Sequence, residues 1–149
     1  MNGVFLNPIG FVVSDIKERV DENWGIVKAR IEMNKEYTGG LTGLESFSHA
    51  IILTYLHESQ FEISRHLKRR PRGLLSMPEL GIFSQRAKDR PNPIGVTTVE
   101  ILKVGSSFLE VKGLDAISDT PVLDIKPYFP HFDRIEEPII PSWVDVLMQ

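Results

Sequence analysis

The chain contains no cysteine among its 149 residues. That absence excludes disulfide bonds, thiol nucleophiles and cysteine-ligated metal sites together. The four histidines do not form an H-x-x-x-H pair, so we expect no metal site. A glycine-rich turn of the G-x-G type and a G-x-S-x-G motif are missing as well. These absences argue against a doubly wound nucleotide-binding fold and against hydrolysis by a catalytic triad.

Long hydrophobic runs are also missing. No stretch approaches the ~18 consecutive apolar residues that a membrane-spanning helix needs. Residues 1–13 lack the basic start of a secretion signal, and Asn7 and Pro8 interrupt their short apolar run. We therefore expect a cytoplasmic protein that has no membrane partner.

Positive charge is in short supply, since 17 lysines and arginines stand against 20 acidic residues and the formal net charge is −3. No overall field attracts nucleic acid, so we expect no DNA partner, and any polyanion has to be met by a local patch. The exception is the basic segment from Arg65 to Arg72, which holds five formal positive charges in eight residues. Two interpretations stay open for it: a solvated loop, or a patch whose Arg69, Arg70 and Arg72 contact phosphates.

The hydrophobic pattern is that of short strands. Residues 26–33 alternate apolar and charged side chains, which is typical of a strand with one wet face. Residues 49–57 are nearly all apolar and too few for a typical helix, which favours a buried strand. The clearest hairpin joins residues 96–104 to residues 108–114 through Gly105-Ser106-Ser107.

Further strands are expected at residues 9–13 and 120–128, a helix is possible over residues 58–70, and an irregular arm begins at about residue 129. About six to eight short, mostly antiparallel strands with short helices predict a mainly β fold, a small closed β-barrel that hides its strand edges. A chain of this length can bury one core, so we expect a single domain over residues 1–149.

Residues 86–93, called the proline loop here, contain two prolines one residue apart. Each proline fixes its own backbone and holds the residue before it, Arg90 or Asn92, in an extended conformation. Gly95 follows where the chain enters an apolar run, and it allows a turn or the close approach of a ligand. The segment is either a cradle for an anion or cofactor, or a rigid turn between strands.

Residues 120–128 read as a strand with prolines near both ends. Alternation along the strand places Val122, Asp124, Lys126 and Tyr128 on one face and the remaining apolar side chains on the other. A carboxylate, an ammonium group and a phenol then stand in a row. The row is either an exposed face with a weak ion pair or a functional site.

These segments follow one another in an order that resembles a known family. The longest matches are residues 90–95 (Arg-Pro-Asn-Pro-Ile-Gly) and residues 120–128 (Thr-Pro-Val-Leu-Asp-Ile-Lys-Pro-Tyr). Shorter ones are Gly81-Ile82-Phe83, Gly113-Leu114-Asp115 and Phe47-Ser48-His49. In these motifs and their order the chain closely resembles the TrmO/TsaA-like family.

The resemblance implies a compact β-barrel that works as a homodimer and binds S-adenosylmethionine. Characterised members are tRNA methyltransferases that methylate the N6 atom of threonylcarbamoyladenosine beside the anticodon. Carried onto this sequence, the cofactor-binding residues are Leu56, His57, Arg86, Val96, Leu114 and Asp115.

The roles that this resemblance implies follow the chemistry of the side chains. Arg86 would pair with the methionine carboxylate of the cofactor. Leu56, Val96 and Leu114 would form an apolar slot for the adenine, and Asp115 would accept from ribose hydroxyls or attract the sulfonium.

The residues expected to take part in catalysis are the polar ones of the strand at residues 120–128. Asp124, Lys126 and Tyr128 would orient the nucleophilic nitrogen or take its proton. Arg90 and Asn92 would hold the substrate or brace the site, and the basic segment would meet tRNA phosphates.

Two other functions stay open. One is methylation of a small molecule, which the net negative charge and the lack of the C-terminal domain of longer bacterial members favour. The other is a non-catalytic module that binds the cofactor or a partner protein. Ser118-Asp119 stands where many members have Asp-Gly, a change that alters a tight turn before the last strand.

Overall fold

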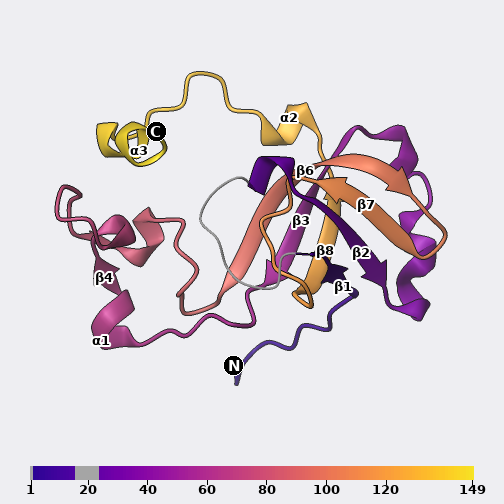
Figure 1. Ribbon diagram of the computed structural model, residues 1–149, viewed down its shortest axis with the longest axis horizontal. Helices are drawn as coiled ribbons and strands as arrows, with labels where there is room; N and C mark the ends of the chain where they lie inside the picture. The colour runs from indigo at the N-terminus through magenta and orange to yellow at the C-terminus, as the bar shows by residue number, and fades with distance from the viewer. Residues whose placement is uncertain (1, 16–23) are drawn as a thin grey trace. The chain divides into compact units, whose positions relative to one another are not determined.

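The computed structural model of the chain describes residues 2–15 and 24–149 (Figure 1). Its contacts divide the chain into two compact units, which we call the barrel unit and the second unit. The barrel unit comprises Met1–His57 and Ile94–Phe129, and the second unit comprises Glu58–Pro93 and Pro130–Gln149. The expectation of a single domain over residues 1–149 stays a prediction.

The barrel unit is a closed barrel of six strands, in the order β1-β2-β7-β6-β3-β8. Every neighbouring pair is antiparallel, and β8 closes the ring by pairing with β1 (Figure 1). The strands are β1 (Gly10–Val13), β2 (Lys28–Met33), β3 (His49–Tyr55), β6 (Ile94–Val104), β7 (Phe108–Lys112) and β8 (Pro121–Pro127). The predicted mainly β fold, a small closed antiparallel barrel with short helices, is confirmed.

Alternating burial in the strands builds the barrel core. In β2, Ala29 and Ile31 lie in the core, whereas the charged residues that alternate with them face outward, as the sequence predicted. Complete burial of a side chain such as Ile31 contributes about 1.5–3 kcal/mol to folding. The other large side chains that are fully buried in this core are Val12, Ile52, Val99, Leu109, Val111, Leu114 and Val122.

β3 lies between two other strands of the barrel. β3 pairs with β6 on one side and β8 on the other, so both of its edges are covered. The predicted hairpin is also confirmed, as β6 and β7, and the Gly105 N–H donates to the Phe108 carbonyl at 2.8 Å in the turn between them. The described part of this unit also contains the 3₁₀ turns η1 (Trp24–Ile26), η2 (Lys35–Leu41) and η3 (Leu44–Ser46).

A bulge in β8 changes which of its side chains share a face. Leu53 pairs with Asp124 and Thr54 with Val122, so the extra residue, Leu123, has no partner on β3. Val122 therefore lies in the core although Asp124 faces outward, and Ile125 packs against the core from the same side as Val122. The prediction that Val122 shares a face with Asp124 is wrong, because strict alternation does not continue through a bulge.

The second unit has little regular structure. Its elements are α1 (Ile63–His66), β4 (Lys68–Arg69), η4 (Pro71–Gly73), β5 (Leu80–Gly81), η5 (Ile82–Ser84), α2 (Pro130–Asp133) and α3 (Ser142–Leu147). The helix expected over residues 58–70 is reduced to α1, because Lys68 and Arg69 pair with β5 instead. Among the described residues, no helix combines the length and apolar character needed to cross a membrane.

The turn before β8 is held in a conformation that suits glycine. Asp119 has a φ of +71°, in the left-handed region. Its N–H donates to the Val12 carbonyl at 2.7 Å, and the Thr120 hydroxyl donates to the Ile117 carbonyl at 2.7 Å. These bonds fix the turn against β1, which explains why the Asp-Gly expected in many family members suits this position.

We expect Asp119→Gly to leave the protein as stable as before or up to ~1 kcal/mol more stable, because glycine adopts a positive φ without a steric penalty. Asp119→Val should lower the free energy of unfolding by about 1–2 kcal/mol, since a β-branched residue is strained there. Urea unfolding of the three proteins measures both effects. Equal midpoints for the valine and glycine variants would contradict this account of the turn.

Candidate functional site

The predicted catalytic residues of β8 lie on the outer wall of the barrel. Lys126 Nζ lies 2.9 Å from Asp124 Oδ2, and both side chains are about half exposed. The hydrogen bond and the charge of Asp124 raise the pKa of Lys126 above its ordinary value. Lys126 is therefore an ammonium group at neutral pH, which can donate hydrogen bonds but cannot take a proton. Of the two predicted roles, only orientation of a substrate is open to it.

Tyr128 lies next to a histidine that sequence reasoning did not propose as functional. The Tyr128 N–H donates to the His49 carbonyl at 3.1 Å, and the two rings meet edge-on with centroids 6.4 Å apart. Ser48 Oγ lies 2.7 Å from His49 Nδ1. The sequence could have indicated this position. His49 begins the apolar segment of β3, and alternation along the strand places its side chain on the face opposite to that of the buried Ala50.

Three neighbouring strands bring the β8 row beside an exposed apolar surface. Leu53 of β3 pairs with Asp124 on one side and with Val96 of β6 on the other, so Val96 and Asp124 stand about 10 Å apart. Val96, Ile94 and Tyr55 are each more than 40% exposed. We call this surface the outer strip, and it consists of Ile51, Leu53, Tyr55, Ile94, Val96, Thr98, Asp124 and Lys126.

Gly95 allows the first residues of β6 to pack closely against the end of β3. A Cβ atom at this position would lie 2.5 Å from Thr54 Oγ1 and 3.1 Å from Leu56 Cδ2. The side chains of Thr54 and Leu56 therefore occupy the space that a side chain at position 95 would need. The structure thus brings two of the predicted cofactor-binding residues, Leu56 and Val96, to either side of Gly95, and His57 is exposed at the end of the same segment.

Leu114 and Asp115 follow β7 and have opposite environments. Leu114 is fully buried in the barrel core, so a ligand could reach only its backbone. Asp115 is exposed. Gly113, with a φ of +94°, turns the chain between the strand and these residues, and its N–H donates to the Val27 carbonyl at 2.8 Å. The expected adenine slot therefore cannot include the Leu114 side chain, whereas Leu56 and Val96 remain candidates.

The remaining predicted cofactor residue, Arg86, belongs to the proline loop of the second unit and is exposed. Arg90, four residues later, is partly buried, and its Nη1 donates to the carbonyls of Gln85 at 2.7 Å and Ala87 at 3.1 Å. Arg90 therefore braces the loop that carries Arg86. Asn92 is exposed. The predicted roles of Arg90 and Asn92 in substrate binding stay predictions.

The basic segment is partly tied to its own unit. The Nη1 atoms of Arg70 and Arg72 donate to the carbonyls of Met77 and Leu147. Arg65 and Lys68 each have a carboxylate at 3.8 Å, from Glu62 and Glu79 respectively, with all four side chains more than half exposed. Arg69 supplies a backbone carbonyl to the buried Gln85 side chain at 2.8 Å. Each of these groups keeps donors that are free to meet a phosphate.

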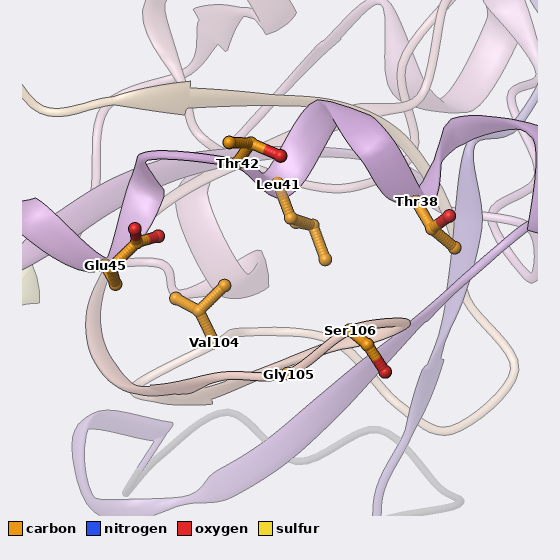
Figure 2. Close-up of a pocket in the computed structure, with 7 residues that line it drawn as sticks. All are labelled: Thr38, Leu41, Thr42, Glu45, Val104, Gly105 and Ser106. Atoms are coloured by element: carbon orange, nitrogen blue, oxygen red, sulfur yellow. The ribbon is translucent and has the colours of Figure 1, made fainter.

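A small pocket of about 260 Å³ lies elsewhere in the barrel unit (Figure 2). Leu41 of η2 and Val104 of β6 point into it, with Glu45 and hydroxyl groups around them (Figure 2). None of the predicted site residues lines this pocket. In the part of the chain that the structure describes, no group of three or more acidic or histidine side chains is placed to hold a metal ion.

Comparison with known proteins agrees with this arrangement of motifs. Residues 16–134 match the family model of the tRNA-methyltransferase O N-terminal domain. A probable S-adenosyl-L-methionine-binding protein of Methanothermobacter thermautotrophicus is 38% identical over 134 residues, which cover 87% of this chain and 93% of that protein. The human tRNA (adenine(37)-N6)-methyltransferase is 38% identical over 116 residues, which cover 76% of this chain.

The crystal structure of TrmO from Pseudomonas aeruginosa superposes with a TM-score of 0.74 at 28% identity, over 92% of this chain. The chain spans 61% of that solved chain and 25% of the human protein. The match to the family model over most of the sequence, and the near full-length match to an archaeal relative, confirm the resemblance seen in the motifs. The chain belongs to the family of tRNA-methyltransferase O N-terminal domains.

Proposed function

We propose that this protein is an S-adenosylmethionine-dependent methyltransferase that acts on tRNA, at N6 of a threonylcarbamoyladenosine. The observation that carries the proposal is the family match over residues 16–134. A human relative is named a tRNA (adenine(37)-N6)-methyltransferase, and archaeal relatives of matching length are named S-adenosyl-L-methionine-binding proteins. A cytoplasmic location stays a prediction.

The side chains on the outer strip fit the chemistry of this cofactor. Tyr55, Ile94 and Val96 offer an exposed apolar surface suited to an adenine ring. The Asp124 carboxylate lies two strands from Val96 and one strand from Tyr55, and together with Lys126 it adds a hydrogen-bonding edge to this surface. When bound, the cofactor supplies an activated methyl group.

The chain's own contribution to the reaction is mainly positioning. Holding two reactants in line can lower the barrier by roughly 7–11 kcal/mol without any covalent intermediate. Lys126 would orient the acceptor as a hydrogen-bond donor, while Asp124 keeps it charged and in place. Tyr128 and His49 stand at the end of the same row, and either would be a candidate to take the proton that the acceptor loses.

A second candidate function is binding of the cofactor without catalysis. It is favoured by the names of the archaeal relatives, of which this chain covers 93–96% and which refer to binding alone. Methylation of a small molecule is the remaining alternative. The experiment below separates the three.

The purified protein should transfer label from methyl-labelled cofactor to tRNA that carries the threonylcarbamoyl group, and not to tRNA that lacks it. Scintillation counting of the recovered tRNA measures the transfer. Cofactor binding without transfer to either tRNA would support the binding module. Label found only in small molecules of a cell extract would support the third function.

Arg86→Ala provides the internal test of the cofactor site. Loss of the guanidinium should weaken cofactor binding by at least about tenfold, which corresponds to ~1.4 kcal/mol, and should abolish the transfer of label. The matched control is Lys88→Ala, which removes another exposed cation from the same loop. Titration calorimetry that gives equal affinities for both variants would remove Arg86 from the site.

We propose that the basic segment contacts the tRNA phosphates, through Arg69, Arg70 and Arg72. The double variant Arg69→Gln/Arg72→Gln should reduce the slope of log affinity against log salt by roughly two, since two phosphate contacts are lost. Lys28→Gln/Lys112→Gln, on the barrel strands β2 and β7, removes the same charge and serves as control. If both double variants change the slope equally, the segment acts only through net charge.

We also propose that the protein is a homodimer, as the family resemblance implies. Phe11 and Val13 support this, because both alternate outward on β1 and are more than 40% exposed, an unusual place for neighbouring large apolar groups. Sedimentation equilibrium should give twice the 16.9 kDa mass of one chain. Phe11→Glu should give monomers, and Phe83→Glu, at an exposed phenylalanine of the second unit, should not. A monomeric wild-type protein at micromolar concentration would end the proposal.

A further inference from the structure

The proline loop depends on side chains for its shape. Its residues belong to no helix or strand of the structure, although two prolines stiffen its second half. Two systems of polar contacts hold it to the rest of the second unit. The first is the pair described above, in which Arg90 donates to carbonyls at the start of the loop and Gln85 anchors that start to β4 and β5.

The second system begins at Asp89, the residue before Arg90. Its Oδ1 accepts the Gln60 N–H at 3.0 Å, and its Oδ2 lies 3.8 Å from Nε2 of His66. The Asp89 and His66 side chains are only 18% and 9% exposed. The loop is therefore attached to the segment that leads into α1 as well as to the β4–β5 ladder.

The tautomer of His66 follows from its other contact. Its Nδ1 accepts the Glu62 N–H at 2.9 Å, so that nitrogen carries no proton and the neutral ring has its proton on Nε2. This nitrogen is the one that lies 3.8 Å from Asp89 Oδ2, a contact longer than a direct hydrogen bond. Phe61 packs beside the ring, with centroids 6.1 Å apart. A donor nitrogen of α1 thus lies near an acceptor oxygen of the loop.

We propose that His66 and Asp89 form a positioning pair, which fixes the proline loop in the conformation in which Arg86 binds the cofactor. The inference rests on the proposed function, and it adds two residues that the family motifs in this sequence do not contain. Neither side chain touches the cofactor in this account. Their effect is to raise the fraction of molecules whose loop is already arranged for binding.

The test is Asp89→Asn in the full chain. Asparagine keeps an acceptor for the Gln60 N–H but removes the charge opposite His66 Nε2. The control is Glu79→Gln, which removes the carboxylate that lies 3.8 Å from Lys68 in the same unit, on the exposed surface. Asp89→Glu keeps the carboxylate and serves as the conservative rescue.

Two measurements are needed. Calorimetry should show that Asp89→Asn binds S-adenosylmethionine about five- to tenfold more weakly, because the fraction of competent loops falls. Hydrogen exchange without cofactor should show faster exchange at residues 86–90 and no change in the barrel strands. Glu79→Gln should match the wild type in both measurements, and Asp89→Glu should lie closer to the wild type than Asp89→Asn.

The possible failures are distinct. A wild-type protein that does not bind the cofactor would overturn the proposed function, whatever the loop does. A wild-type protein that binds it, with Asp89→Asn binding equally well or exchanging at the same rate, would overturn the positioning pair alone.

Discussion

The pairing of β8 with both β1 and β3 is the constraint on which the barrel depends. β8 is the last strand of the chain, and it joins the first strand to the third and so closes the ring. Without it, β1 and β3 would each present an open edge of unpaired N–H and carbonyl groups. The bulge at Leu123 allows β8 to point both Val122 and Ile125 into the core while Asp124 and Lys126 face outward. The strand that closes the barrel thus also carries the predicted catalytic residues.

The side chains of six short strands fill the described interior of the barrel. On the outer surface, β3, β6 and β8 provide three adjacent strands with exposed apolar and charged groups, where the proposed site lies. Within this surface the chain packs closely at Gly95. The Leu56 side chain lies against the Gly95 backbone, and a side chain at position 95 would push it away.

The second unit is held together differently. Its only ladder, between β4 and β5, has two residue pairs, so side chain to backbone hydrogen bonds replace the missing regular structure. These bonds show that the motif Arg90-Pro91-Asn92-Pro93 has a structural role. The prolines restrict the backbone, and the Arg90 guanidinium satisfies carbonyls that no strand or helix would otherwise pair. A partly buried arginine of this kind is easily mistaken for a substrate ligand when only the sequence is read.

The sequence by itself determined the β-rich class, the strands with period-two alternation and the hairpin at Gly105, because these follow from contacts between residues close in the chain. The motifs also identified the family and the segments that carry its chemistry. Tertiary structure alone decided the face of Val122, the burial of Leu114, the partners of Arg90 and the loss of helix after His66. The face of Val122, the burial of Leu114 and the end of α1 depend on partners in other strands, about which the local pattern holds no information. The partners of Arg90 lie only three and five residues away, but they depend on the fold of an irregular loop that no periodic pattern describes.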